Sequence, residues 1–259
     1  MSIYALQTLR DLGLNERTSY SIVSQIRLSS LDAGQVVWPR GQYVDSWRFI
    51  MTGMVAFTIP TKVGGHAAID IRGENSWIGE GLILTSQVTP FECSCVTASE
   101  FLTIPRLTLV NLMHTEVVFA NEVARLMAAR TNWQQEMLTL LRFGSPCLRV
   151  VQGLALFAES LNLTEPRSHR ELSASLPAKQ SILATLCGVS RTVMSKYLQT
   201  LQLHGWLSIE YGITKFCRLR AWSEFLDGRR KNGSLNMSPG MGEVLRELER
   251  ADIRIPMAA

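Results

Sequence analysis

The stretch GVSRTVMSKYLQTLQLHGWL, residues 188–207, places a glycine and a Ser-Arg pair immediately before apolar residues at helical spacing. Gly188 tolerates the positive φ that a tight turn requires, and Ser190 carries an oxygen suited to a helix N-cap. The apolar residues that follow cover one face of a helix, so a second face is left for polar side chains. These polar side chains belong to Arg191, Thr192, Ser195, Lys196 and Gln199. The stretch therefore predicts a turn and then a helix with a polar outer face.

The residues on either side of this stretch predict a winged helix-turn-helix. Before it, a short helix starting at Pro177 presents the small Ala184 where the second helix must pass close by. After it, the run HGWLSIEYGITKFCRLR predicts a helix end at Gly205 and then a two-stranded wing. Lys215 and Arg218 of this run are predicted to face phosphates.

The second helix of such a unit enters the major groove of DNA, and its first turns reach the base edges. Arg191 and Thr192 are therefore predicted to contact bases, and the fork of Arg191 suits the two acceptors of guanine. Lys196 is predicted to contact a base or a phosphate, and Ser190, Ser195 and Gln199 complete the DNA-binding residues predicted on this helix. A plain pair of packed helices with solvated charges is the alternative interpretation, and the hairpin after the second helix favours DNA binding.

Composition and charge fit a globular chain with one basic half. The chain has 259 residues, of which 46% are hydrophobic and 19% charged, which is enough for about two domains with real cores. Up to Pro146 there are 11 basic and 12 acidic residues, and from Pro146 onward 15 basic and 10 acidic residues. A basic C-terminal half suits a polyanion partner, although this asymmetry is a weak indicator.

No window approaches 18 uninterrupted apolar residues, and the start of the chain lacks the pattern of a signal peptide. We therefore expect a cytoplasmic protein with no membrane partner. The 5 cysteines are expected to be reduced core residues in that compartment.

In the half before Pro146, the predicted secondary structure changes from strands to helix near residue 105. From Leu31 to Ile104, short apolar runs alternate with glycine-rich turns, which predicts an all-β roll. From there to Phe143 the pattern is helical, and the sequence Phe-Gly-Ser-Pro then predicts a helix end, an N-cap and a new helix. The fold class predicted is α+β: a roll, a long dimerisation helix and a winged helix-turn-helix. The domains expected are 1–110 (sensory roll with N-terminal helices), 111–143 (dimerisation helix), 144–226 (DNA-binding domain) and 227–259 (linker and extension).

The long helix carries apolar residues at alternating steps of three and four, a spacing typical of a coiled-coil seam. Arg130 occupies a polar slot in this stripe, where it would fix the register of a homodimer. The alternative is that the stripe packs on the roll, and both interpretations can hold at different turns. The dimer interface predicted consists of Phe119, Val123, Leu126, Arg130, Trp133 and Met137.

This order of parts resembles the family of bacterial regulators named for the cyclic-AMP receptor protein and the fumarate-nitrate reductase regulator (Crp/Fnr). The segments that carry the resemblance are PRGQYVDSWRFIMTGMVAF, WIGE and GVSRTVMSKYL, and it covers about residues 20–222. The resemblance implies a cyclic-nucleotide-binding-like roll and a homodimer that reads a two-fold symmetric operator in double-stranded DNA. It also implies RNA polymerase as a partner if the protein is an activator. At Thr192 the family frequently has Glu, so the usual half-site preference does not carry over.

The family's effector pocket implies a role for Gly79 and Glu80, which match the Gly-Glu that holds a ribose in cyclic-nucleotide binders. In those proteins an Arg-Ser or Arg-Thr pair then holds the cyclic phosphate, but Glu92 and Cys93 align there. A carboxylate repels a phosphate, so the sequence argues against cyclic AMP. Cys95 completes the predicted pocket, which gathers two thiols on one strand face and leaves a redox role open.

The iron–sulfur branch of the family has an N-terminal cysteine cluster, and no cysteine precedes Cys93, so we expect neither a cluster nor any other metal or cofactor. His66 or His114 as a single haem ligand is the alternative. Two rival functions remain. One is a redox- or small-molecule-responsive interaction module that has lost DNA binding, against which Arg191 and Lys196 speak. The other is a cupin-like enzyme, which the single histidine of the roll disfavours; we expect no catalytic residues.

Overall fold

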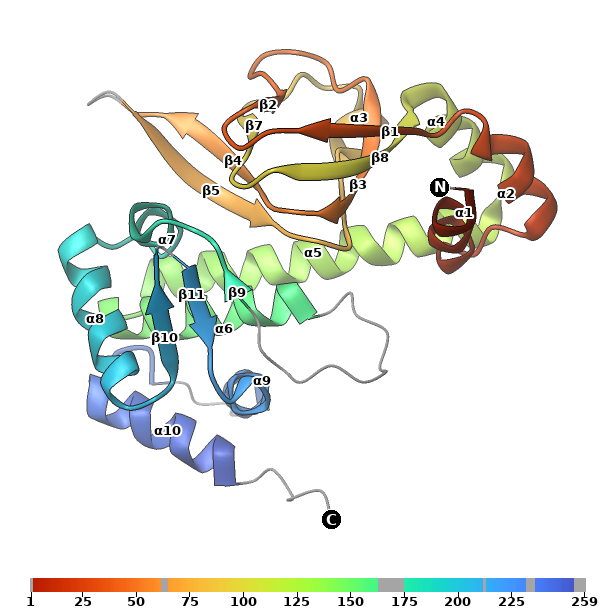
Figure 1. Cartoon of the computed structure of the whole chain (residues 1–259). Coiled ribbons are helices and arrows are strands. Elements are labelled where there is room, and N and C mark those ends of the chain that lie inside the picture. Colours follow the sequence, from red (N-terminus) through yellow and green to blue (C-terminus); the bar gives the residue numbers. More distant parts are fainter. Residues whose placement is uncertain (1, 62–64, 163–174, 212, 232–235, 254–259) are drawn as a thin grey trace. The chain divides into compact units, whose positions relative to one another are not determined.

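The computed structural model describes residues 2–61, 65–162, 175–211, 213–231 and 236–253. The chain divides into two compact units (Figure 1). Unit 1 contains residues 1–59 and 71–132, and unit 2 contains residues 60–70 and 133–259. No helix in the described ranges combines the length and the apolar character that a membrane crossing requires.

Two four-stranded antiparallel sheets form the roll, which confirms the predicted α+β class. One sheet has the order β1-β8-β3-β6 and the other β2-β7-β4-β5. Helices precede, interrupt and follow these strands. The bounds are α1 Ser2–Asp11, α2 Glu16–Val23, β1 Arg27–Leu31, β2 Val36–Trp38, β3 Ser46–Thr52, β4 Val55–Pro60, β5 His66–Arg72, β6 Ser76–Ile78, α3 Glu80–Thr85, β7 Glu92–Cys95, β8 Ser99–Pro105 and α4 Arg106–Thr115.

A long helix, α5 (Val117–Phe143), begins in unit 1 and packs there on the outside of the roll. Trp47 and Trp77 stack with ring centroids 3.7 Å apart, and Phe119 of α5 meets Trp47 edge to face. Phe119 and Val123 are fully buried in this core. Apolar contact with the roll therefore fixes the first half of the helix.

This packing corrects the predicted dimer seam. Phe119, Val123, Trp133 and Met137 are all buried by the chain's own side chains, so they offer little surface to a partner helix. Of the predicted seam only Leu126 is exposed, and the Arg130 side chain is 25% exposed in an ion pair. The stripe covers the protein's own core, as the alternative interpretation allowed.

Unit 2 contains the helix-turn-helix and the chain that follows it. Strands β10, β11 and β9 form a three-stranded antiparallel sheet in the order β10-β11-β9. Helix α8 follows α7 after a tight turn, and the β10–β11 hairpin follows α8. The bounds are α6 Pro146–Asn162, β9 Ser175–Leu176, α7 Gln180–Leu186, α8 Arg191–Leu203, β10 Leu207–Glu210, β11 Ile213–Phe216, α9 Leu219–Lys231 and α10 Met241–Ile253.

The end of α5 belongs to unit 2, where the boundary lies between Asn132 and Trp133. Trp133 donates its indole N–H to the carbonyl of Leu156 in α6 at 3.2 Å. A compact unit therefore includes the last turns of α5 together with α6, whereas the sequence-based boundary at residue 143 follows the end of the helix. The four domain ranges given from the sequence remain a prediction.

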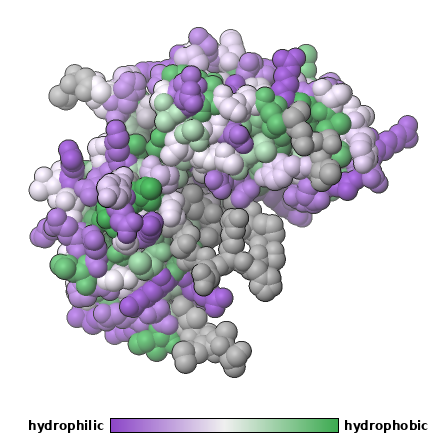
Figure 2. Space-filling view, in the orientation of Figure 1, coloured by the Kyte–Doolittle hydropathy of each residue, from purple (hydrophilic) through white to green (hydrophobic). Residues whose placement is uncertain are grey.

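The described part of the C-terminal extension that forms α10 packs within unit 2. Helix α10 packs against α9 and α6 with a buried apolar face (Figure 1). On the visible side, hydrophilic residues cover much of its outer surface (Figure 2). The sequence predicted a short helix here and left open whether it packs on the DNA-binding domain.

Candidate DNA-binding surface

Helix α8 starts where the sequence predicted it. Ser190 is the N-cap, and its hydroxyl oxygen accepts a hydrogen bond from the backbone N–H of Val193 at 3.2 Å. Gly188, in the turn, has a φ of +60°, which favours glycine. Met194, Leu198 and Leu201 are fully buried, and they fix the rotation of the helix about its axis.

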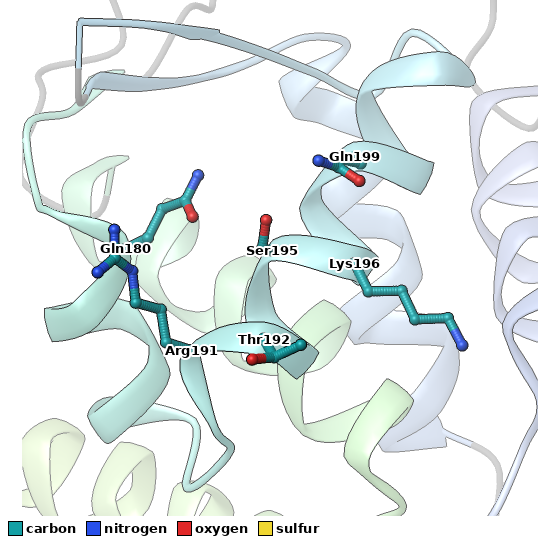
Figure 3. A pocket seen from close by; sticks show the side chains of 6 residues that line it. All are labelled: Gln180, Arg191, Thr192, Ser195, Lys196 and Gln199. Carbon is teal, nitrogen blue, oxygen red and sulfur yellow. The ribbon is translucent and has the colours of Figure 1, made fainter.

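The side chains on the opposite face of α8 line an open depression of about 430 Å³. All five polar residues predicted for the outer face line it, together with Gln180 of α7. Arg191 and Gln180 lie near each other at one end, and Lys196 extends away on another side of the helix (Figure 3). The six residues are Gln180, Arg191, Thr192, Ser195, Lys196 and Gln199.

Sequence reasoning missed Gln180, because it belongs to the helix before the turn. The available signal was its position at the first residue of α7, the end that the turn geometry brings toward the start of α8. An amide side chain offers both a donor and an acceptor, so it fits the same nucleic-acid chemistry as its neighbours.

The turn between α7 and α8 is tied to α6. Arg149 of α6 donates a hydrogen bond to the carbonyl of Gly188 at 2.7 Å. A Cβ at Gly188 would lie 3.0 Å from a methyl carbon of Leu141, so a larger residue would press against the end of α5. The turn is therefore held from both sides, and α8 presents its polar face at a fixed angle.

The two basic residues predicted on the wing lie at different places. Lys215, on β11, forms an exposed ion pair with Glu210 across the hairpin at 3.1 Å. Arg218 follows β11 at the base of the hairpin, where its guanidinium lies over the ring of Trp206 and pairs with Asp252 of α10 at 3.0 Å. Neither residue lines the depression on α8. Tyr211, next to the end of β10, is fully exposed.

Glu80, predicted for the effector pocket, is buried and already has partners. Its carboxylate accepts a hydrogen bond from the indole N–H of Trp47 at 2.9 Å and forms an ion pair with Arg130 of α5. Arg130 also donates to the carbonyl of Trp77. Each carboxylate oxygen of Glu80 thus already accepts one hydrogen bond from a side chain of the protein. Gly79, with a φ of +104°, is the N-cap of α3 beside it.

The remaining predicted pocket residues lie on β7. Cys93 and Cys95 are buried, while Glu92 has intermediate exposure and pairs in register with Thr58 of β4. Burial raises the pKa of the Cys95 thiol, so little thiolate is present at neutral pH. All five cysteines are outside disulfides. Within the described ranges, no three His, Cys, Asp or Glu residues gather as metal ligands would; His114 is exposed at the end of α4, and His66 is exposed at the start of β5.

Comparisons with known proteins give a family for the roll and a fold for the chain. Residues 28–116 match the cyclic nucleotide-binding domain family. No curated protein matches the chain by sequence.

Solved structures match over most of the chain. The structure of FixK2 from Bradyrhizobium japonicum aligns with a TM-score of 0.62 at 14% identity, over 74% of this chain and 92% of that one. A putative cAMP-binding regulatory protein from Silicibacter pomeroyi DSS-3 aligns with a TM-score of 0.58 at 16% identity, over 86% and 96%. A CRP/FNR-family transcriptional regulator from Thermus thermophilus gives 0.55 at 18% identity, over 76% and 97%.

The roll matches a sequence family, and the similarity of fold covers 74–86% of the chain. Residues 28–116 are therefore similar to the cyclic nucleotide-binding domain family, and the fold of the chain is similar to that of solved Crp/Fnr-type regulators.

Proposed function

We propose that this protein is a DNA-binding transcription regulator of the Crp/Fnr type that acts as a homodimer. The observation that carries the proposal is the outer face of α8, where five polar side chains surround an open depression while the opposite face is buried. Two structural neighbours, from Thermus thermophilus and Eubacterium rectale, are described as transcriptional regulators of the Crp/Fnr family, which supports this function. A location in the same compartment as DNA follows, and RNA polymerase is a further partner if the protein activates transcription.

The chemistry of the face supports roles for individual residues. Arg191 stands at the first position of α8 and carries the two parallel donors that match the guanine acceptors O6 and N7. Thr192 and Gln199 offer both donors and acceptors, and Lys196 supplies a charge for a base or a phosphate. Lys215 on the hairpin contributes a phosphate contact once DNA displaces its exposed ion pair with Glu210.

Dimerisation is proposed through the exposed side of α5, opposite the side that packs on the roll. A second series of residues at alternating steps of four and three follows this side, and all of its members are exposed. Small side chains in its middle allow two helices to approach closely. The series consists of Val117, Asn121, Ala124, Ala128, Thr131, Gln135 and Leu138.

The small molecule sensed by the roll is not cyclic AMP in this proposal. No arginine lies between Thr85 and Ala98, the region that holds the cyclic phosphate in nucleotide binders, and Glu80 is engaged with Trp47 and Arg130. Thiol redox sensing is not favoured either, because burial raises the pKa of Cys95.

The experiment that tests the function is selection of binding sites from a random DNA pool with the full chain, followed by affinity measurements on the selected site. We expect a two-fold symmetric site with half-sites about one helical turn apart. Arg191→Ala should weaken binding to this site by about 1–3 kcal/mol and relax one base position.

Lys215→Ala is the matched control, because it should weaken binding to selected and random DNA alike. It should also reduce the slope of log affinity against log salt concentration by about one. If no site is enriched, or if the two variants lose the same affinity on both kinds of DNA, the assignment of α8 as the recognition helix is wrong.

A further inference from the structure

The last turns of α5 belong to the same compact unit as the recognition helix. Residues 133–143 of α5 lie in unit 2 together with α6 and α8. On these turns Gln135 and Leu138 are exposed, and both are part of the proposed dimer face. Arg149 connects α6 to the turn before α8. In a dimer formed through α5, the separation of the two recognition helices therefore depends on how the end of α5 is held against α6.

Arg230, near the end of α9, joins these two helices. Its Nη1 and Nη2 donate to the two carboxylate oxygens of Glu159 on α6, at 2.6 and 2.8 Å. Its Nε and Nη2 donate to one carboxylate oxygen of Glu136 on α5, at 3.1 and 2.8 Å. The three side chains are between 21% and 37% exposed, so water screens these pairs only in part. A single guanidinium fork thus engages a carboxylate from each helix.

The bridge has one positive charge and two negative charges. Without Arg230, the carboxylates of Glu136 and Glu159 would face each other across α5 and α6, and like charges at this range repel. The second oxygen of Glu136 accepts a hydrogen bond of 3.3 Å from Gln152 of α6. This neutral contact cannot replace the charge of Arg230. The end of α9, which lies beyond the family resemblance in the sequence, therefore supplies the cation that holds α5 against α6.

We propose that Arg230 is a positioning residue, which holds the end of α5 on α6 and so sets the half-site spacing that the dimer reads. Moving one half-site by a base pair shifts it by about 3.4 Å and rotates it by about 35° around the DNA axis. A dimer whose recognition helices are held firmly cannot follow this change. The inference rests on the proposed function and deepens it by naming a residue that sets specificity without touching DNA.

The first experiment measures the affinity of the full chain for three DNA duplexes. They carry the selected half-sites at the selected spacing, one base pair closer and one base pair further apart. We expect the wild-type chain to bind both altered duplexes more weakly. In Arg230→Gln this penalty should shrink at least about threefold for one or both altered duplexes. Arg230→Lys should lie between the two, because it keeps the charge without the fork.

Lys231→Gln is the matched control, because it removes the same charge from the next residue, whose side chain is 79% exposed. It should leave the spacing preference unchanged. A charge exchange provides the rescue: Arg230→Glu should relax the preference, and adding Glu136→Arg should restore it, because one cation again lies between two carboxylates.

The second experiment needs no DNA and follows amide hydrogen exchange in the full chain. In Arg230→Gln, residues 133–143 should exchange at least about threefold faster, whereas residues 191–203 of α8 should keep their rate. Equal acceleration of both segments would indicate a general loss of stability and would overturn the inference.

An unchanged spacing preference in Arg230→Gln also overturns it, and so does unchanged exchange at the end of α5. If Arg230→Gln does not fold, Arg230→Lys and the charge exchange decide. A wild-type chain that selects no two-fold symmetric site contradicts the proposed function and the half-site role with it. Hydrogen exchange then decides separately whether Arg230 holds α5 on α6.

Discussion

Gly53 illustrates how a single residue fixes the roll. Its φ of +91° favours glycine, and a Cβ there would lie 2.4 Å from the carbonyl oxygen of Ala98 and 2.8 Å from the Cα of Ser99. Both contacts are with backbone atoms of the neighbouring chain segment, which cannot rotate away. Gly34 has a similar φ of +85°, yet nothing lies within 4 Å of its would-be Cβ.

We therefore expect Gly34→Ala to lower the free energy of unfolding by about 1–2 kcal/mol, the strain of a left-handed backbone alone. Gly53→Ala should lower it by several kcal/mol more, because steric overlap adds to the same strain. Urea denaturation of both variants measures the difference. Equal losses would show that the backbone near Ala98 adapts without strain.

Cys187 provides a pH-dependent prediction. It is fully buried, and burial raises its pKa from 9.0 to about 12. Between these values the unfolded chain releases the thiol proton while the folded chain keeps it, so stability must fall as the pH rises. From pH 9 to 10 the loss attributable to this thiol is about 1 kcal/mol.

Urea denaturation at the two pH values, in the wild-type chain and in Cys187→Ala, isolates this contribution. The variant should be less stable at pH 9 because of the cavity, and the gap should narrow at pH 10. A gap that stays constant would mean that the thiol ionises equally in both states.

Arg229 shows what connects the C-terminal elements. It is 6% exposed and donates to Gln152 of α6, to Glu247 of α10 and to the carbonyl of Asn236. One side chain thus joins three segments that are distant in sequence. Ser145, at the start of α6, adds two hydrogen bonds to the same region, to the carbonyls of Met237 and Pro239.

We expect Arg229→Ala to lower the free energy of unfolding by about 3–5 kcal/mol, because it leaves Glu247 and two further acceptors without their donor. Lys231→Ala is the control on the same helix, since its 3.8 Å pair with Asp227 is exposed and contributes little. Thermal denaturation compares the two. A small effect of Arg229→Ala would show that α10 docks through its apolar face alone.

Patterns within one element were predictable, and relations between elements were not. The start of α8, its cap and its polar face follow from residues 188–203, because a turn, a cap and an amphipathic helix are all local features. Gln180 shows the limit: its place at the start of α7 is a local feature, but its position beside Arg191 depends on how the fold brings the two helices together.

Helix α5 shows the same limit for the whole molecule. It has two series of residues at steps of three and four, and sequence reasoning chose the more apolar one for the partner. An apolar helix face predicts that the face is buried, but it does not indicate whether the protein's own roll or a second copy of the chain covers it. The burial of Phe119 and Val123 within one chain shows that the roll covers this face.

The exposed side of α5 therefore carries the prediction for assembly. Ala128→Lys places a charge in the middle of the proposed helix pair and should convert the dimer to a monomer. Ala129→Lys, one residue later and about 100° around the helix, should not. Sedimentation of both variants at micromolar concentration tests this, and two dimeric variants would exclude the proposed interface.

The docking of α10 matters to anyone who builds hybrid regulators from this protein. A chimera that joins its recognition unit to another sensor must retain the chain through residue 253, since a transplant ending at the wing would leave the apolar side of α9 uncovered and Arg218 without Asp252. The minimal transferable module is larger than the helix-turn-helix motif, and its boundary is set by packing.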